Sequence, residues 1–136
     1  MVVAVSPDIE FKVVTANGLR HRLAIQGEGP LVVLCHGWPE SWYSWRHQIP
    51  AIANAGFTAV AHDVRGYGES DKPHAIEAYT LKELAADVVG IADALGHETF
   101  ITIGHDWGGP IALTTALLYP ERVYATGSLS VPHLTR

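Results

Sequence analysis

The sequence contains only one cysteine, Cys35, among its 136 residues, which excludes a disulfide within the chain. This cysteine ends an apolar run that begins at Leu31, a composition typical of a buried strand. A thiol in such surroundings stays protonated and packs as a small apolar side chain. We therefore expect Cys35 to be reduced, buried and unreactive.

Positively charged residues are scarce as well. The sequence has nine Lys and Arg residues and fourteen Asp and Glu residues, which gives a net charge of −5. No basic block or stripe is present, which argues against nucleic acid or an anionic membrane as a partner. No apolar stretch reaches membrane-spanning length. The first seven residues lack the basic flank and long apolar core of a secretory signal. These absences predict a cytoplasmic protein.

The chain also lacks internal repeats, low-complexity tracts and linkers, and its 48% apolar content suffices for the core of one modest domain. Asn17-Gly18 predicts a hairpin turn, and Thr80 with Glu83 predicts a capping box at a helix start. We expect strands at 9–14, 19–25, 31–35, 57–61, 99–103 and 124–131, and helices at 41–55, 80–95 and 108–118. This alternation predicts an α/β fold whose mostly parallel sheet is opened by an antiparallel hairpin.

A serine is missing from the position where the surrounding pattern usually carries one. The run Gly104-His105-Asp106-Trp107-Gly108 follows an apolar strand and precedes a helix, as in the Gly-x-Ser-x-Gly nucleophile elbow. Here the same frame presents the carboxylate of Asp106. A covalent intermediate on a carboxylate is an alkyl ester rather than an acyl-enzyme. The pattern therefore predicts that Asp106 is a nucleophile that attacks a saturated carbon.

Three loops follow predicted parallel strands and should meet at the carboxyl edge of the sheet, where α/β proteins place reactive groups. They begin at His36, at His62 and at Asp106. We expect the backbone N–H groups of Trp107 and Trp38 to form an oxyanion hole there, and both indoles to line an apolar pocket. The positive end of the following helix favours an ionised Asp106. The alternative role for Asp106 is that of an ordinary helix N-cap.

Other residues near this site are expected to be structural. We expect His36 and His105 to hold loops through hydrogen bonds, and Asp63 and Arg65 to form an ion pair or loop contacts. The aromatic residues of the segment after the first loop are expected in the core and on a helix surface; they are Trp42, Tyr43 and Trp45. No pattern in the sequence calls for a metal or a cofactor.

Three segments together resemble the α/β-hydrolase-fold epoxide hydrolases. They are His36-Gly37-Trp38-Pro39-Glu40-Ser41-Trp42, Asp63-Val64-Arg65-Gly66-Tyr67-Gly68-Glu69-Ser70 and Gly104-His105-Asp106-Trp107-Gly108-Gly109. The resemblance implies that Asp106 opens a small apolar epoxide and forms the alkyl-enzyme ester. It also implies that the Trp38 and Trp107 amides stabilise the oxyanion when water attacks this ester. Gly37, Pro39, Gly104 and Gly108 would shape the site, with a cis peptide bond before Pro39.

The resemblance also implies parts that this sequence does not contain. The family uses a histidine with an acidic partner to activate water, and two tyrosines on a helical cap to protonate the epoxide oxygen. None of the eight histidines has the required position, and His133 falls where the cap would begin. We therefore expect residues 1–136 to be the N-terminal part of one core domain, with the remainder of the same enzyme as its partner. Alone, this segment is expected to be inactive.

Two alternative enzymes and one non-catalytic alternative stay open. A haloalkane dehalogenase uses the same Asp nucleophile and a following tryptophan, which Trp107 matches, but usually has asparagine where Trp38 stands. A truncated hydrolase-fold module for binding would explain the missing base, although the elbow is intact. An ester or lipid hydrolase is disfavoured, because a carboxylate attacking an ester would give an anhydride.

Overall fold

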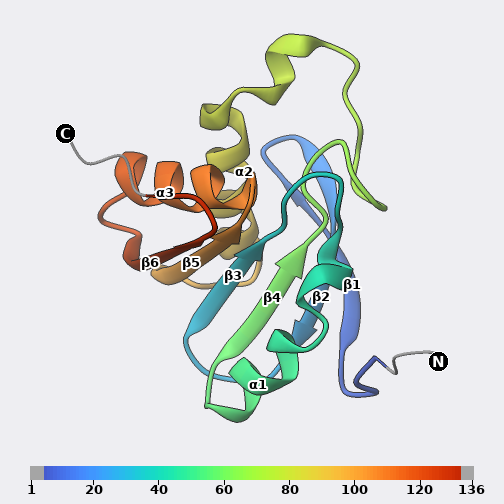
Figure 1. Cartoon of the computed structure of the whole chain (residues 1–136), viewed down its shortest axis with the longest axis vertical. Coiled ribbons are helices and arrows are strands. Elements are labelled where there is room, and N and C mark those ends of the chain that lie inside the picture. The colour runs from blue at the N-terminus through green and yellow to red at the C-terminus, as the bar shows by residue number, and fades with distance from the viewer. Residues whose placement is uncertain (1–4, 133–136) are drawn as a thin grey trace.

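The computed structural model describes residues 5–132, which form one six-stranded sheet in the order β1-β2-β4-β3-β5-β6 (Figure 1). The strands are β1 (Glu10–Ala16), β2 (Leu19–Gln26), β3 (Leu31–Cys35), β4 (Thr58–His62), β5 (Phe100–His105) and β6 (Val123–Leu129). The helices are α1 (Gln48–Asn54), α2 (Leu81–Ala94) and α3 (Gly108–Leu118), with short 3₁₀ turns η1 (Trp42–Trp45) and η2 (Ile76–Tyr79). No helix within residues 5–132 is long and apolar enough to cross a bilayer.

The sheet is antiparallel at its first edge and parallel elsewhere, which confirms the expected fold class. β1 and β2 pair around Asn17-Gly18, where both residues have positive φ angles of 50° and 75°. Such angles at both central residues are typical of the hairpin turns that match strand twist. β2 also pairs antiparallel with β4, and from there β4, β3, β5 and β6 run parallel.

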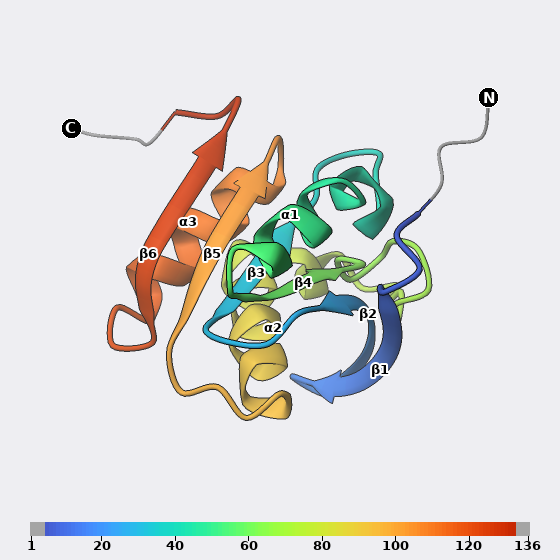
Figure 2. The same cartoon turned by 90° about the horizontal axis from the view of Figure 1, so that it is seen from below.

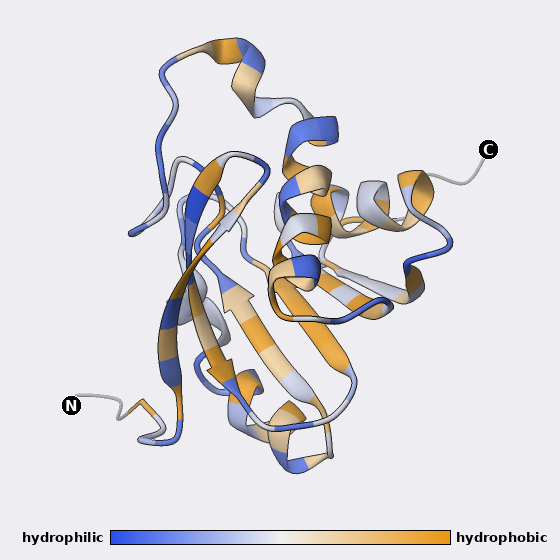
Figure 3. Cartoon of the chain, turned by 180° about the vertical axis from the view of Figure 1, so that it is seen from behind, coloured by the Kyte–Doolittle hydropathy of each residue, from blue (hydrophilic) through white to orange (hydrophobic). Residues whose placement is uncertain are grey.

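The two faces of the sheet are covered by different helices, α2 and α3 on one side and α1 on the other (Figure 2). All five residues of β3 are buried. Leu31 and Val33 pack in the core toward α2 and α3, whereas Val32 and Leu34 pack in the core toward α1. Apolar residues accordingly fill the central strands (Figure 3). Burial on both faces explains why β3 is a continuous apolar run rather than an alternating one.

The predicted single helix over 41–55 is wrong, because the segment forms η1 and then α1 as separate pieces. Trp42 and Trp45 are both buried, and the three-residue repeat of a 3₁₀ helix places them on the same side. The Trp42 N–H also donates to Oδ1 of Asp63 over 3.0 Å, which anchors the turn to the next loop. The Ser41 hydroxyl caps η1 by accepting from the Tyr43 N–H.

The other element boundaries differ less from the expectation. Thr80 caps α2 by accepting from the Glu83 N–H at 3.3 Å. The Glu83 carboxylate, however, accepts from the Asn17 side chain, so only half of the predicted capping box forms. β6 ends at Leu129 rather than at 131, since Ser130 adopts a positive φ of 68°.

Candidate active site

Asp106 lies at a sharp turn between β5 and α3, at the carboxyl edge of the sheet. Its φ angle is 55°, a left-handed conformation that few non-glycine residues adopt. A Cβ at Gly104 would overlap the Gly108 carbonyl oxygen, and a Cβ at Gly108 would overlap the Cys35 carbonyl oxygen. Strand, turn and helix therefore pass so closely that both positions require glycine.

The Asp106 carboxylate uses its two oxygens differently. Oδ2 accepts two backbone hydrogen bonds, from Trp38 N at 3.0 Å and from Trp107 N at 2.7 Å. Oδ1 accepts no hydrogen bond from any of residues 5–132. The two amides, Trp38 first, hold the pKa of Asp106 below its ordinary value of 3.8. The side chain is half-buried, ionised at neutral pH and free at one oxygen.

The alternative role of Asp106 as an N-cap is wrong. An N-cap side chain accepts from the N–H two or three residues further along the helix. The Asp106 carboxylate instead accepts from the next residue and from Trp38 in another loop. The α3 helix begins after Trp107, which has no capping side-chain hydrogen bond.

The loop that supplies the Trp38 amide is held by His36. Nδ1 of His36 donates to the Gly37 carbonyl at 2.8 Å, and Nε2 accepts from the Val64 N–H at 3.0 Å. This pattern requires the neutral ring, and burial lowers the pKa of His36. The Trp38–Pro39 peptide bond is cis, as the resemblance implies. His36 thus joins the loop after β3 to the loop after β4.

His105 lies on the other side of the elbow and interacts with Glu40. Its Nδ1 is 3.5 Å from Oε1 of Glu40, whose other oxygen accepts from the Ser44 hydroxyl. His105, Glu40 and Ser44 line a second cavity of about 240 Å³ behind the loop after β3. His105 therefore contacts a loop rather than the carboxylate of Asp106, but its ring makes no hydrogen bond within residues 5–132, unlike the expectation and unlike His36.

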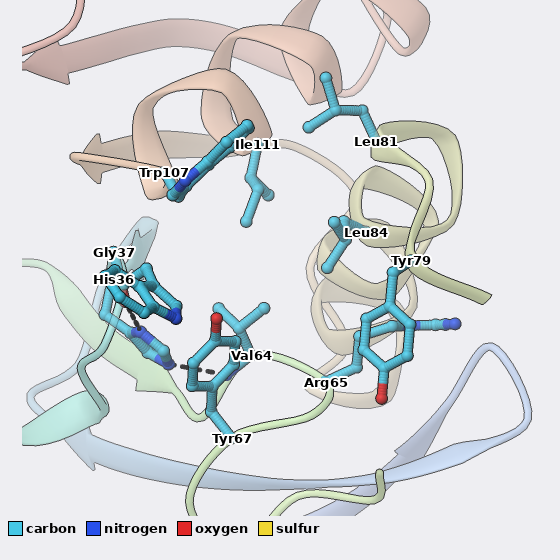
Figure 4. Close-up of a pocket in the computed structure, with 11 residues that line it drawn as sticks. His36, Gly37, Val64, Arg65, Tyr67, Tyr79, Leu81, Leu84, Trp107 and Ile111 are labelled. Carbon is cyan, nitrogen blue, oxygen red and sulfur yellow. Dashed lines mark hydrogen bonds between the residues drawn. The ribbon is translucent and has the colours of Figure 1, made fainter. Parts of the chain in front are cut away.

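A cavity of about 260 Å³ opens beside the elbow (Figure 4). Trp38 and Trp107 form its rim and are 64% and 62% exposed. Its other lining residues come from η2, α2, α3 and the loops after β3 and β4; they are His36, Gly37, Val64, Arg65, Tyr67, Tyr79, Leu81, Leu84 and Ile111. Asp106 adjoins this cavity through Gly37, Trp38 and Trp107. The lining is largely apolar, as expected for a site that binds an apolar molecule.

No sequence pattern marks Tyr67 or Tyr79 as a site residue, although both line this cavity. Tyr67 belongs to one of the three loops predicted to meet at the carboxyl edge, and that placement was the signal available. Tyr79 reaches the cavity from η2, whose approach depends on the long connection between β4 and α2. No local pattern predicts that approach.

Of the two roles expected for Asp63 and Arg65, the loop contacts are present and an ion pair between the two side chains is not. Asp63 pairs with Arg22 at 3.1 Å and accepts from the Trp42 and Glu69 N–H groups. Arg65 instead pairs with Asp87 of α2 through two hydrogen bonds of 2.6 and 2.7 Å. Asp63 and Arg65 are neighbours along a loop that turns sharply, so each reaches a different element.

The remaining expectations concern the aromatic segment and metals. Trp42 and Trp45 are buried, and Tyr43 is 41% exposed. Cys35 is buried, and burial raises the pKa of its thiol to about 12. Residues 5–132 contain no cluster of His, Cys, Asp and Glu side chains suited to a metal ion. His133 lies outside the described residues.

Comparison with known proteins gives a consistent set of relatives. Residues 30–134 match the alpha/beta hydrolase fold family. The chain is 56% identical to Epoxide hydrolase B of Mycobacterium tuberculosis over 109 residues. These residues make up 80% of this chain and 31% of that protein. It is 51% identical to Bifunctional epoxide hydrolase 2 of Sus scrofa, over 86% of this chain and 21% of that protein.

Solved structures agree with these sequences. The epoxide hydrolase from an endophytic Streptomyces is similar with a TM-score of 0.94 and 52% identity, over 96% of this chain and 40% of that one. The epoxide hydrolase VrEH1 from Vigna radiata is similar with a TM-score of 0.92 and 42% identity, over 98% of this chain and 42% of that one. The chain thus spans well under half the length of the proteins that it matches.

Proposed function

Since the chain belongs to the alpha/beta hydrolase fold family, we propose that it forms the N-terminal part of an enzyme that hydrolyses epoxides to vicinal diols. The observation that supports this most directly is the Asp106 carboxylate, with one oxygen on two amides and the other free. The names of the relatives support the substrate class.

In the first step, Oδ1 of Asp106 attacks a ring carbon of the epoxide. The bond between that carbon and the ring oxygen breaks, and its electron pair stays on the oxygen, which takes up a proton. The product is an alkyl ester of Asp106 that carries a neighbouring hydroxyl group. The lowered pKa of Asp106 keeps the nucleophile ionised, and the two amides hold Oδ2 so that Oδ1 faces the substrate.

In the second step, water attacks the carbonyl carbon of that ester. Negative charge develops on Oδ2, where the Trp38 and Trp107 N–H groups already point. Donors placed in advance at a developing charge lower the barrier without reorganisation. The diol then leaves with the original Oδ1, and the carboxylate is regenerated. The proton donor for the first step and the base for the second are expected from the rest of the enzyme, including its cap.

A single turnover of the full-length protein with styrene oxide in ¹⁸O-labelled water tests this scheme. The first diol should contain unlabelled oxygen from Asp106, and the label should appear in the Asp106 carboxylate. Label in the first diol with none in Asp106 would mean direct attack by water, and the covalent mechanism would be wrong.

A haloalkane dehalogenase remains the second candidate, because the Trp107 indole on the cavity rim could hold a leaving halide. Trp38, rather than asparagine, and the names of the relatives favour the epoxide. The full-length protein should form diol from styrene oxide and release no bromide from butyl bromide. Release of bromide without formation of diol would instead favour the haloalkane dehalogenase.

A further inference from the structure

The phenol ring of Tyr67 lies at the floor of the cavity beside Asp106 (Figure 4). Its backbone is held at both ends, because its N–H donates to the Val64 carbonyl at 2.9 Å and its carbonyl accepts from the Ser70 N–H at 3.1 Å. The ring packs edge-to-face against the His36 imidazole, with centroids 5.2 Å apart and planes at 82°. These contacts position the Tyr67 ring in the wall of the cavity.

The Tyr67 hydroxyl points into the cavity and makes no hydrogen bond to any residue between 5 and 132 (Figure 4). The other polar groups on the floor are already engaged. Both ring nitrogens of His36 have partners, and Arg65 binds Asp87 and the Ala78 carbonyl. The Tyr79 hydroxyl points away and donates to the Pro73 carbonyl at 2.7 Å. Tyr67 therefore presents a hydrogen-bond donor among largely apolar walls.

This hydroxyl stays protonated. Burial first, and then the charges of Tyr79 and Asp106, raise the pKa of Tyr67 above its ordinary value of 10.0. A neutral O–H donor beside an apolar wall binds an uncharged oxygen acceptor well, because leaving it unpaired when a ligand excludes water is unfavourable.

The position of Tyr67 indicates which oxygen it can reach. Tyr67 and Asp106 both follow strands at the same edge of the sheet, and Tyr67 lies on the floor of the cavity that Asp106 adjoins. A displacement at carbon requires the attacking and leaving oxygens to lie on opposite sides of that carbon, so the ring oxygen of the epoxide points away from the Asp106 carboxylate. An oxygen on the substituent next to the ring has no such constraint.

We infer that Tyr67 is a specificity residue that donates a hydrogen bond to an ether or carbonyl oxygen next to the epoxide ring, so that the site favours glycidyl ethers over hydrocarbon epoxides. This inference rests on the proposed function and names the substrate class of the same site. Tyr67 acts on binding of the substrate and is not required for the displacement itself.

The test compares phenyl glycidyl ether with (2-phenylethyl)oxirane, in which a methylene group replaces the ether oxygen. Binding is measured through the fluorescence of the rim tryptophans in full-length Asp106→Asn protein, which cannot form the ester. Adding Tyr67→Phe should weaken binding of the ether about five- to tenfold, the loss of one neutral hydrogen bond. Binding of the carbon analogue should not change, which also shows that the cavity is intact.

Tyr79→Phe in the same background is the matched control, since this phenol lines the cavity but donates outside it. It should alter both dissociation constants by the same factor. If Tyr67→Phe weakens both ligands equally, or neither, Tyr67 is only part of the wall and the inference is wrong. Because no turnover is required, the ratio decides the role of Tyr67 even if the wild-type protein opens neither epoxide.

Discussion

The backbone N–H of Trp38 lies 3.0 Å from Oδ2 of Asp106, although 68 residues separate them in the sequence. The contact arises because β3 and β5 are neighbours in register, with Cys35 opposite Gly104. The loops that leave these two strands therefore meet at the same edge of the sheet. One oxygen of the carboxylate is held by this contact and by the Trp107 amide, and the other is left free.

Asp106→Asn should abolish covalent alkylation by styrene oxide and lower diol formation by the full-length protein at least about 10³-fold, because an amide is a far weaker nucleophile. Mass spectrometry of the peptide that spans position 106 measures the adduct. Glu121→Gln, an exposed carboxylate at the amino end of β6, is the control and should leave the adduct unchanged. An adduct that persists on this peptide in the Asp106→Asn variant would remove Asp106 from the mechanism.

The isolated chain of residues 1–136 should not sustain diol production. Its described residues supply the proposed nucleophile, Asp106, and two amides but no histidine whose ring contacts the Asp106 carboxylate. Incubation with styrene oxide should yield at most one adduct per chain, measured by intact mass. Diol accumulating beyond one equivalent would show that the chain is catalytically complete.

Gly37→Ala should lower the rate of adduct formation about 10-fold or more, because the new Cβ would lie 2.6 Å from Oδ2 of Asp106 and overlap the Asp106 Cβ. The carboxylate would then have to leave the two amides. Gly127→Ala is the matched control, since a Cβ there meets Ile103 at an ordinary 3.8 Å. Equal rates for both variants would mean that the carboxylate position does not matter.

Arg65→Met should lower the free energy of unfolding by about 3–5 kcal/mol, because it leaves the buried Asp87 carboxylate without its main partner. The Arg65 and Asp87 side chains are only 4% and 1% exposed. Arg20→Met breaks a pair with Asp71 in which Arg20 is 73% exposed, and should cost no more than about 1 kcal/mol. Urea unfolding measures the free energy of unfolding of both variants. Similar losses would contradict the expectation that the buried pair stabilises the fold more than the exposed one.

Stability should fall as the pH falls below about 6.5. Burial lowers the pKa values of His21, His36 and His62 in the folded protein, and that of His62 lies well below 6.5. In this pH range the unfolded chain binds more protons than the folded one, so the loss grows as pH falls toward the folded pKa values. Each histidine contributes up to roughly 1.4 kcal/mol per pH unit. Melting temperatures between about pH 5 and 8 measure this, and a His62→Leu variant should show a shallower decline. A flat wild-type profile would contradict neutral buried histidines.

Local patterns in the sequence were sufficient for most of the elements and for the elbow. The Asn17-Gly18 turn and the apolar run of β3 depend on neighbouring residues alone. The spacing of Gly104, Asp106 and Gly108 can also be recognised within one short segment, although Gly108 is required by a contact with β3, where a Cβ would overlap the Cys35 carbonyl oxygen. The succession of strands and helices along the chain likewise follows from the hydrophobic periodicity. This succession also indicates which loops meet at the site.

Contacts between distant segments were decided only by the tertiary structure. Arg65 pairs with Asp87 of α2 rather than with Asp63, its near neighbour in the loop. The segment 41–55 is divided into η1 and α1, and Trp42 and Trp45 of η1 both lie in the core. The cavity into which the Tyr67 hydroxyl points also forms only where the loops after β3 and β4 meet η2, α2 and α3. A sequence pattern records which residue types a turn tolerates, whereas partners across the fold depend on how whole elements pack, and packing is a property of all their side chains at once.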